Sequence, residues 1–203
     1  MIDGTIVPFT VDETFERGAE ARVAYLVGSN ALEFPPGTFP ARSPAADAVE
    51  QLKRRLLVVA RTYESPESYD ENILSDVLFT EPARRLAALH SRNGSPTYLY
   101  RFSVLAEAAP FKLAAHGADR QYVFGNLDTL LWPYGPRDVS ASNTMSAYWV
   151  AFARHGDPNG AGRPGWPRYT SVADELIEFT NDGPVMRRVP AAGALDAIGA
   201  TYR

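Results

Sequence analysis

Three short apolar runs along the chain are typical of β-strands. They comprise residues 23–28, 97–104 and 175–179, and each contains β-branched or aromatic side chains with few breakers. The first run ends in Gly-Ser-Asn at residues 28–30, which favours a strand buried in a parallel sheet. The sequence therefore predicts a sheet of about three strands.

Longer segments between these runs carry apolar residues at intervals of three or four, the spacing of one helix face. The predicted helical segments are residues 46–63, 70–78, 81–90 and 138–155. Pro82 is placed to begin the third segment, because proline fits the first turn of a helix. We expect Ser140 or Ser142 to cap the last segment through its hydroxyl oxygen. Strands separated by helices indicate an α/β fold.

Two features carry no functional prediction. His90 shares a helix face with Ala83, Leu86 and Ala87, and its simplest interpretation is a surface histidine near the helix C-terminus, where the helix dipole favours it. The tail from Pro190 is rich in alanine and glycine, and we expect it to be peripheral. With no internal repeat and no second boundary, residues 1–203 are expected to form a single domain.

The composition argues against several kinds of binding site. The formal net charge is −4, so a nucleic-acid-binding surface has no electrostatic support. The absence of cysteine rules out disulfides and thiolate metal sites. We expect no metal and no cofactor. Hydrophobic residues make up 45% of the chain and charged residues 22%, which is ordinary for a globular protein.

No targeting segment is expected. The first twenty residues include Asp3, Asp12, Glu13 and Glu16 without a long apolar run, which does not fit a signal peptide. No run approaches the roughly 20 apolar residues of a membrane span. A cytoplasmic chain is therefore the default expectation. The scarcity of lysine and abundance of alanine weakly favour a bacterial source.

Two ionisable residues follow predicted strands. Glu33 lies in the loop after the first strand, and His116, followed by Gly117, comes twelve residues after Val104. Ligand crevices of open α/β sheets lie outside the carboxyl ends of the strands, so these residues could converge. A histidine there can act as a base near neutral pH. Taken alone, a loop histidine is more often packed or solvated than catalytic, and the simplest interpretation of Glu33 alone is a solvated loop carboxylate.

The sequences of four segments resemble those of the type-B carboxylesterases, the cholinesterase-like branch of the α/β-hydrolases. The segments are residues 28–33 (Gly-Ser-Asn-Ala-Leu-Glu), 116–125 (His-Gly-Ala-Asp-Arg-Gln-Tyr-Val-Phe-Gly), 148–159 (Tyr-Trp-Val-Ala-Phe-Ala-Arg-His-Gly-Asp-Pro-Asn) and 166–169 (Trp-Pro-Arg-Tyr). The resemblance extends from about Asp3 to Thr180. It implies that Glu33 is the orienting acid of a triad and His116 its general base and acid, acting on a carboxylic ester.

The third member of such a triad is missing. Family members carry the serine in Gly-x-Ser-x-Gly on a strand-to-helix turn, before the acid and the histidine. No serine here has glycine two residues before or after it, and no glycine-rich oxyanion-hole segment is present. The chain therefore resembles the C-terminal half of the fold, a partial domain without the half that holds the nucleophile. An apolar edge strand would then be left open for pairing with a partner.

Three functions fit these observations. The first is a serine carboxylesterase whose N-terminal half is a separate chain or a missing segment, so that this chain supplies only glutamate and histidine. The second is a non-catalytic, cholinesterase-like binding module, against which the presence of both Glu33 and His116 argues mildly. The third is an inactive, truncated remnant of an esterase.

Overall fold

Four strands form one mixed sheet in the order β1-β2-β3-β4. The computed structural model describes residues 2–110 and 113–202. Its strands are β1 (Tyr25–Asn30), β2 (Thr97–Phe102), β3 (Glu175–Thr180) and β4 (Gly183–Arg188). The first three are parallel, with Tyr25 opposite Thr97 and Asn30 opposite Phe102, and β4 runs antiparallel to β3. The three predicted strands are confirmed.

The sequence prediction missed β4, so its count was one strand short. This strand begins Gly-Pro and ends Arg-Arg, and it therefore lacks the apolar run by which the others were found. Its place at the sheet edge explains why proline is tolerated there.

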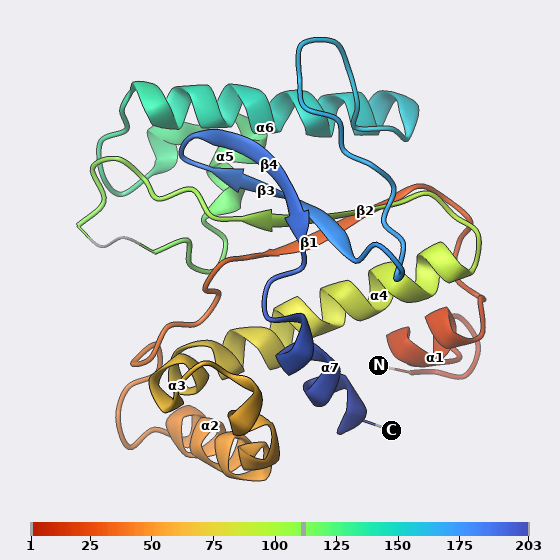
Figure 1. Ribbon diagram of the computed structural model, residues 1–203, viewed down its shortest axis with the longest axis vertical. Coiled ribbons are helices and arrows are strands. Elements are labelled where there is room, and N and C mark those ends of the chain that lie inside the picture. Colours follow the sequence, from red (N-terminus) through yellow and green to blue (C-terminus); the bar gives the residue numbers. More distant parts are fainter. Residues whose placement is uncertain (1, 111–112, 203) are drawn as a thin grey trace.

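Helices cover both faces of the sheet. They are α1 (Val11–Glu16), α2 (Pro44–Arg55), α3 (Pro66–Ser75), α4 (Glu81–Arg92), α5 (Asp119–Phe124), α6 (Pro136–His155) and α7 (Ala192–Ala200), with 3-10 turns at Leu57–Thr62 and Leu127–Thr129. Figure 1 shows α5 and α6 on one face, α4 and α7 on the other, and α2 and α3 below the end of the sheet to which β2 points.

The segments predicted as two helices at 70–78 and 81–90 are continuous. A π-helical turn, Asp76–Thr80, joins α3 to α4, and the N–H of Glu81 donates to the carbonyl of Asp76 five residues back. Pro82 gives the physical reason, because it has no N–H to donate and its ring would clash with the carbonyl four residues earlier. The wider turn accommodates the proline without ending the helix.

The cap of α6 also differs from the prediction. Neither Ser140 nor Ser142 caps it, since the helix begins two residues earlier than expected, at Pro136. The carboxylate of Asp138 instead accepts a hydrogen bond of 2.9 Å from the N–H of Gly135. Ser142 donates to the carbonyl of Tyr122 at 3.0 Å and so ties α6 to α5.

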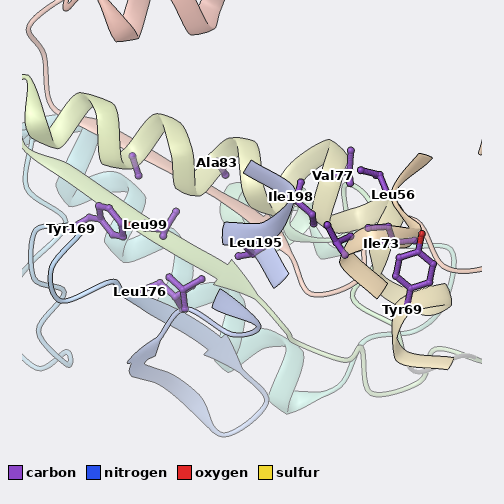
Figure 2. Close-up of a cluster of buried hydrophobic side chains, with 13 residues drawn as sticks. Leu56, Tyr69, Ile73, Val77, Ala83, Leu99, Tyr169, Leu176, Leu195 and Ile198 are labelled. Carbon is purple, nitrogen blue, oxygen red and sulfur yellow. The ribbon is translucent and has the colours of Figure 1, made fainter. Parts of the chain in front are cut away.

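The tail is part of the core, and the prediction that it is peripheral was wrong. Helix α7 inserts Leu195 and Ile198 into the apolar cluster between α3, α4 and the sheet, as Figure 2 shows. Leu195 is 1% exposed and Ile198 is fully buried. Alanine and glycine in the rest of α7 permit close approach to α4: a Cβ on Gly199 would lie 2.9 Å from a carboxylate oxygen of Glu81.

Truncating Leu195 is expected to destabilise the fold strongly. Leu195→Ala should lower the free energy of unfolding by about 2–5 kcal/mol, because it leaves a cavity in a packed core. Urea denaturation measures the change, and Leu131→Ala is the control, since Leu131 is 93% exposed. A loss equal to that of the control would mean that α7 is not docked.

His90 is in the last turn of α4 as predicted, but it is buried rather than on the surface. Its Nδ1 lies 2.9 Å from Oε1 of Glu20, and its Nε2 lies 2.8 Å from the carbonyl oxygen of Val23. The ring packs against Phe15 and Tyr25, with centroid distances of 5.6 and 5.2 Å. Both nitrogens face acceptors, so the geometry calls for a doubly protonated, cationic imidazole paired with Glu20.

Removing this imidazole is expected to destabilise the protein. His90→Ala leaves the buried Glu20 carboxylate without its cation, a change that costs about 3–5 kcal/mol in comparable pairs. The exposed His155, in the last turn of α6, provides the control His155→Ala, which should change stability by less than about 0.5 kcal/mol. Equal urea midpoints for the two variants would contradict the ion pair.

Candidate active site

The loops that follow β1 and β2 lie side by side because their strands are parallel neighbours. Backbone hydrogen bonds join the two loops directly: the N–H of Leu32 donates to Ala114 O at 3.2 Å, and that of His116 donates to Glu33 O at 3.0 Å. Glu33 and His116 are therefore adjacent although 83 residues separate them in the sequence. Gly117, with φ of +73°, makes the sharp turn beside the histidine that its sequence position suggested.

The two side chains form a hydrogen-bonded pair. Nδ1 of His116 lies 2.7 Å from Oε2 of Glu33, and the other carboxylate oxygen accepts a 2.7 Å hydrogen bond from the N–H of Asn30. The side chain of Glu33 is only 6% exposed, whereas that of His116 is 57% exposed. An ionised carboxylate can only accept, so the neutral imidazole carries its proton on Nδ1 and leaves the Nε2 lone pair available. Within residues 2–110 and 113–202, no group hydrogen-bonds to Nε2.

Asn30 connects both loops, and the sequence prediction overlooked it. Its side-chain amide donates to Ala115 O at 2.7 Å and approaches a carboxylate oxygen of Asp119 at 3.4 Å. The hydroxyl of Tyr100 donates to the other oxygen of Asp119 at 3.0 Å. Because its main chain also donates to Glu33, this buried asparagine fixes the acid and the histidine relative to each other. Its side-chain carbonyl oxygen is buried without a partner in the described part of the chain.

Aromatic rings support the imidazole. Phe34 and Phe79 lie 5.3 and 5.0 Å from His116 between ring centroids, and 5.3 Å from each other. Phe79 belongs to the π-helical turn, and the N–H of Phe34 donates to the hydroxyl of Ser75 at 3.0 Å, at the end of α3. The helical excursion between β1 and β2 therefore buttresses the ring, a role that periodicity alone could not indicate.

Gly28 lets β1 pack tightly against β2. A Cβ at this position would lie 2.2 Å from the carbonyl oxygen of Tyr100 and 2.4 Å from its ring, which no side chain can satisfy. The glycine thus permits Tyr100 to reach Asp119 and to complete the hydrogen-bonded network under the site.

In the described residues, no group of three or more histidine, cysteine, aspartate or glutamate side chains could hold a metal ion. The helices of that same part of the chain include none long and apolar enough to cross a bilayer.

Comparisons with known proteins place this chain in a family. The sequence profile of the carboxylesterase family matches residues 46–196. Carboxylesterase 1D of Rattus norvegicus is 28% identical over 199 residues, which cover 83% of this chain and 35% of the relative. Carboxylesterase 5A of Felis catus is 37% identical over 115 residues, or 52% of this chain and 21% of the relative.

Solved structures agree with the sequence comparison. A structure of PNB esterase superposes with a TM-score of 0.76 at 25% identity, covering 97% of this chain and 42% of the esterase. The fold is thus that of the C-terminal part of an α/β-hydrolase, as the sequence predicted. Some of these curated relatives align with most of this chain. The chain spans only about a third of their length. It belongs to the carboxylesterase family.

Proposed function

We propose that this chain supplies the glutamate and the histidine of a Ser-Glu-His triad that hydrolyses carboxylic esters. The observation that carries the proposal is the 2.7 Å contact between Glu33 and Nδ1 of His116, a histidine whose side chain is 57% exposed. The serine and the oxyanion hole come from polypeptide outside these 203 residues, since the sequence contains no Gly-x-Ser-x-Gly. Residues 1–203 then form one partial catalytic domain.

Each group has a defined role in this reaction. Nε2 of His116 takes the serine proton as the serine oxygen attacks the acyl carbon, and it then gives that proton to the departing alcohol oxygen. Water then attacks the acyl-enzyme: Nε2 of His116 takes a proton from the water and gives it to the serine oxygen, and the carboxylic acid is released. Glu33 holds the ring in the required tautomer and stabilises the imidazolium that forms at each proton transfer.

The open edge of β1 supports pairing with the polypeptide that would supply the serine. Two N–H groups point toward β2. That of Tyr25 donates to the carbonyl just before β2 at 2.9 Å, and that of Ala31 donates to the carbonyl of the last residue of β2 at 2.8 Å. Alternate residues of a strand present their backbone groups to opposite sides, so those of Leu26 and Gly28 face away from β2. No strand in the described part of the chain occupies that side. Such an edge is a template for another strand, from a preceding segment or a second chain.

A fluorophosphonate probe tests the proposal, because it bonds to a serine activated by histidine and an oxyanion hole. We would label the native preparation and determine intact masses. The expected result is a label on a serine of polypeptide that co-purifies with this chain. Absence of label from every component of an otherwise folded preparation would refute the catalytic role and leave a binding module or an inactive remnant.

A further inference from the structure

The turn that follows α2 holds two apolar side chains away from the core. Leu57 and Val58 begin the 3-10 turn Leu57–Thr62 and are 61% and 58% exposed. Their neighbours Leu56 and Val59 are buried in the apolar cluster that α3 and α7 share. Single exposed apolar side chains are common on protein surfaces, so this pair is informative only together with its surroundings.

Three arginines surround the pair. Arg54 and Arg55 lie three residues before Leu57 and Val58, and Arg61 lies three residues after Val58. Residues three apart share one face of a helix or a 3-10 turn, so the five side chains form one surface, which we call the basic turn. All five are exposed to solvent.

The positive charge of the basic turn has no counter-charge within the described chain. Residues 51–63 contain four basic residues and no acidic one. Lys53 pairs with Asp70 at 2.9 Å, but the side chains of the three arginines take part in no ion pair or hydrogen bond among the described residues. The helix dipole favours the two arginines at the end of α2, yet it explains neither the third nor the exposed apolar pair. On a chain whose net charge is −4, this local excess indicates an anionic partner.

A lipid surface would use both parts of the basic turn. Arginines pair with lipid phosphates and carboxylates, and apolar side chains between them enter the headgroup layer, as in amphipathic segments bound to anionic bilayers. A nucleic acid would use only the cations, because residues 54–61 contain no aromatic ring on which a base could stack. A symmetric contact with a second copy would place the same arginines against each other. Figure 1 shows α2 at one end of the long axis of the molecule, a position open to a flat surface.

We propose that the basic turn is a docking surface for anionic lipid bilayers. Its two apolar side chains lie in the headgroup layer, and its three arginines contact the lipid phosphates around them. The inference goes beyond the proposed function and does not depend on it, since docking uses neither Glu33 nor His116.

Vesicle binding by the intact 203-residue chain tests the proposal. We would measure co-sedimentation with vesicles of phosphatidylcholine alone, and of phosphatidylcholine and phosphatidylserine in equal parts. Binding should require phosphatidylserine, and it should weaken as salt rises from about 0.1 to 1 M, because the screening length falls from about 10 to 3 Å. Absence of binding to the mixed vesicles, or equal binding to both kinds, would overturn the proposal. His116→Ala should bind as the unaltered chain does, so docking and ester hydrolysis can fail separately.

Removing the three arginines should weaken binding to the mixed vesicles about a hundredfold, because each cation near an anionic surface raises the affinity about fivefold. The variant is Arg54→Gln/Arg55→Gln/Arg61→Gln.

A matched control changes the net charge equally at exposed arginines of other segments. The control is Arg22→Gln/Arg154→Gln/Arg188→Gln. It should weaken binding by less than about threefold, because charges farther from the bilayer than the screening length contribute little. Equal losses in the two triple variants would mean that net charge rather than the basic turn drives binding, and they would overturn the proposal.

The apolar pair distinguishes a bilayer from other polyanions. Leu57→Ser/Val58→Ser should weaken vesicle binding about tenfold or more, because both side chains lose apolar burial. The same variant should leave any affinity for heparin, a soluble polyanion, unchanged. A vesicle affinity that the double variant does not alter would replace the bilayer by a general polyanion and contradict the inference.

Insertion can be observed directly with a label. The chain contains no cysteine, so Val58→Cys can be labelled specifically with an environment-sensitive fluorophore. Its emission should shift to shorter wavelength on the mixed vesicles. The same label at Val150→Cys, on α6 at the opposite end of the long axis, should not respond. Equal responses at the two positions would exclude docking through the basic turn.

Discussion

Replacing His116 by alanine is expected to lower ester turnover by about 10⁴-fold or more in a preparation that contains the activated serine. The variant removes the group proposed to take the serine proton, since Nδ1 is held by Glu33 and the His116 side chain is 57% exposed. Binding of the ester to the rest of the site remains, so the loss should fall on kcat. Steady-state hydrolysis of a p-nitrophenyl ester measures it, at equal total concentrations of the serine-bearing polypeptide in the variant and unaltered preparations.

The matched control is His155→Ala. His155 is an exposed histidine in the last turn of α6, and its removal should leave kcat unchanged. A loss smaller than about tenfold for His116→Ala, with the fold intact, would remove this histidine from the mechanism. Intact folding is checked by the urea midpoint of each variant.

The sequence could predict that Glu33 and His116 meet, because that conclusion depends only on topology. Both residues follow apolar runs that read as parallel strands, and the carboxyl ends of neighbouring parallel strands share one edge. The resemblance to carboxylesterases then suggested a role for each. The contact between the carboxylate and Nδ1 is what the structure adds; the roles themselves stay predictions.

Groups that support the pair could not be predicted in the same way. Asn30 acts through Ala115 and Asp119, which are 85 and 89 residues away, and a single asparagine after a strand carries no pattern. Phe79, in the π turn at Asp76–Thr80, lies 5.0 Å from the imidazole of His116 between ring centroids, and the sequence pattern predicts no π turn there. Such partners depend on tertiary packing, which local periodicity does not encode.

The wrong predictions share a related cause. An alanine- and glycine-rich tail has little amphipathic contrast, so nothing in its pattern distinguishes the buried Leu195 from a peripheral residue. The position of His90 near a helix C-terminus, where the dipole favours a histidine, predicts a surface residue, whereas Glu20 and Val23, far away in sequence, enclose it here. In both cases a distant segment determines burial.

The Glu33–His116 pair is complete within this chain, whereas the proposed function takes its serine from other polypeptide. Both oxygens of Glu33 are engaged by residues of the described part, and the imidazole is fixed by Phe34 and Phe79. A serine supplied by other polypeptide would therefore meet a preorganised base. The tautomer of His116 can accordingly be measured in the isolated chain.

Glu33→Gln should reverse that tautomer. Each carboxylate oxygen of Glu33 now faces a donor, the N–H of Asn30 at 2.7 Å and Nδ1 of His116 at 2.7 Å. An amide has one oxygen and one NH₂, and the backbone N–H of Asn30 cannot become an acceptor. The amide oxygen is therefore expected to face Asn30 and the NH₂ to face Nδ1, which moves the ring proton to Nε2.

A proton on Nε2 blocks the base, so kcat should fall by about 10⁴-fold while the fold is retained, as in other triads whose carboxylate becomes an amide. In the isolated chain at a pH where His116 is neutral, ¹⁵N NMR should show the unprotonated nitrogen moving from Nε2 to Nδ1. Glu175→Gln, at an exposed carboxylate on β3, should change neither quantity. An unchanged tautomer would contradict the hydrogen-bond argument, and a changed tautomer with unchanged kcat would mean that another base and acid perform the reaction.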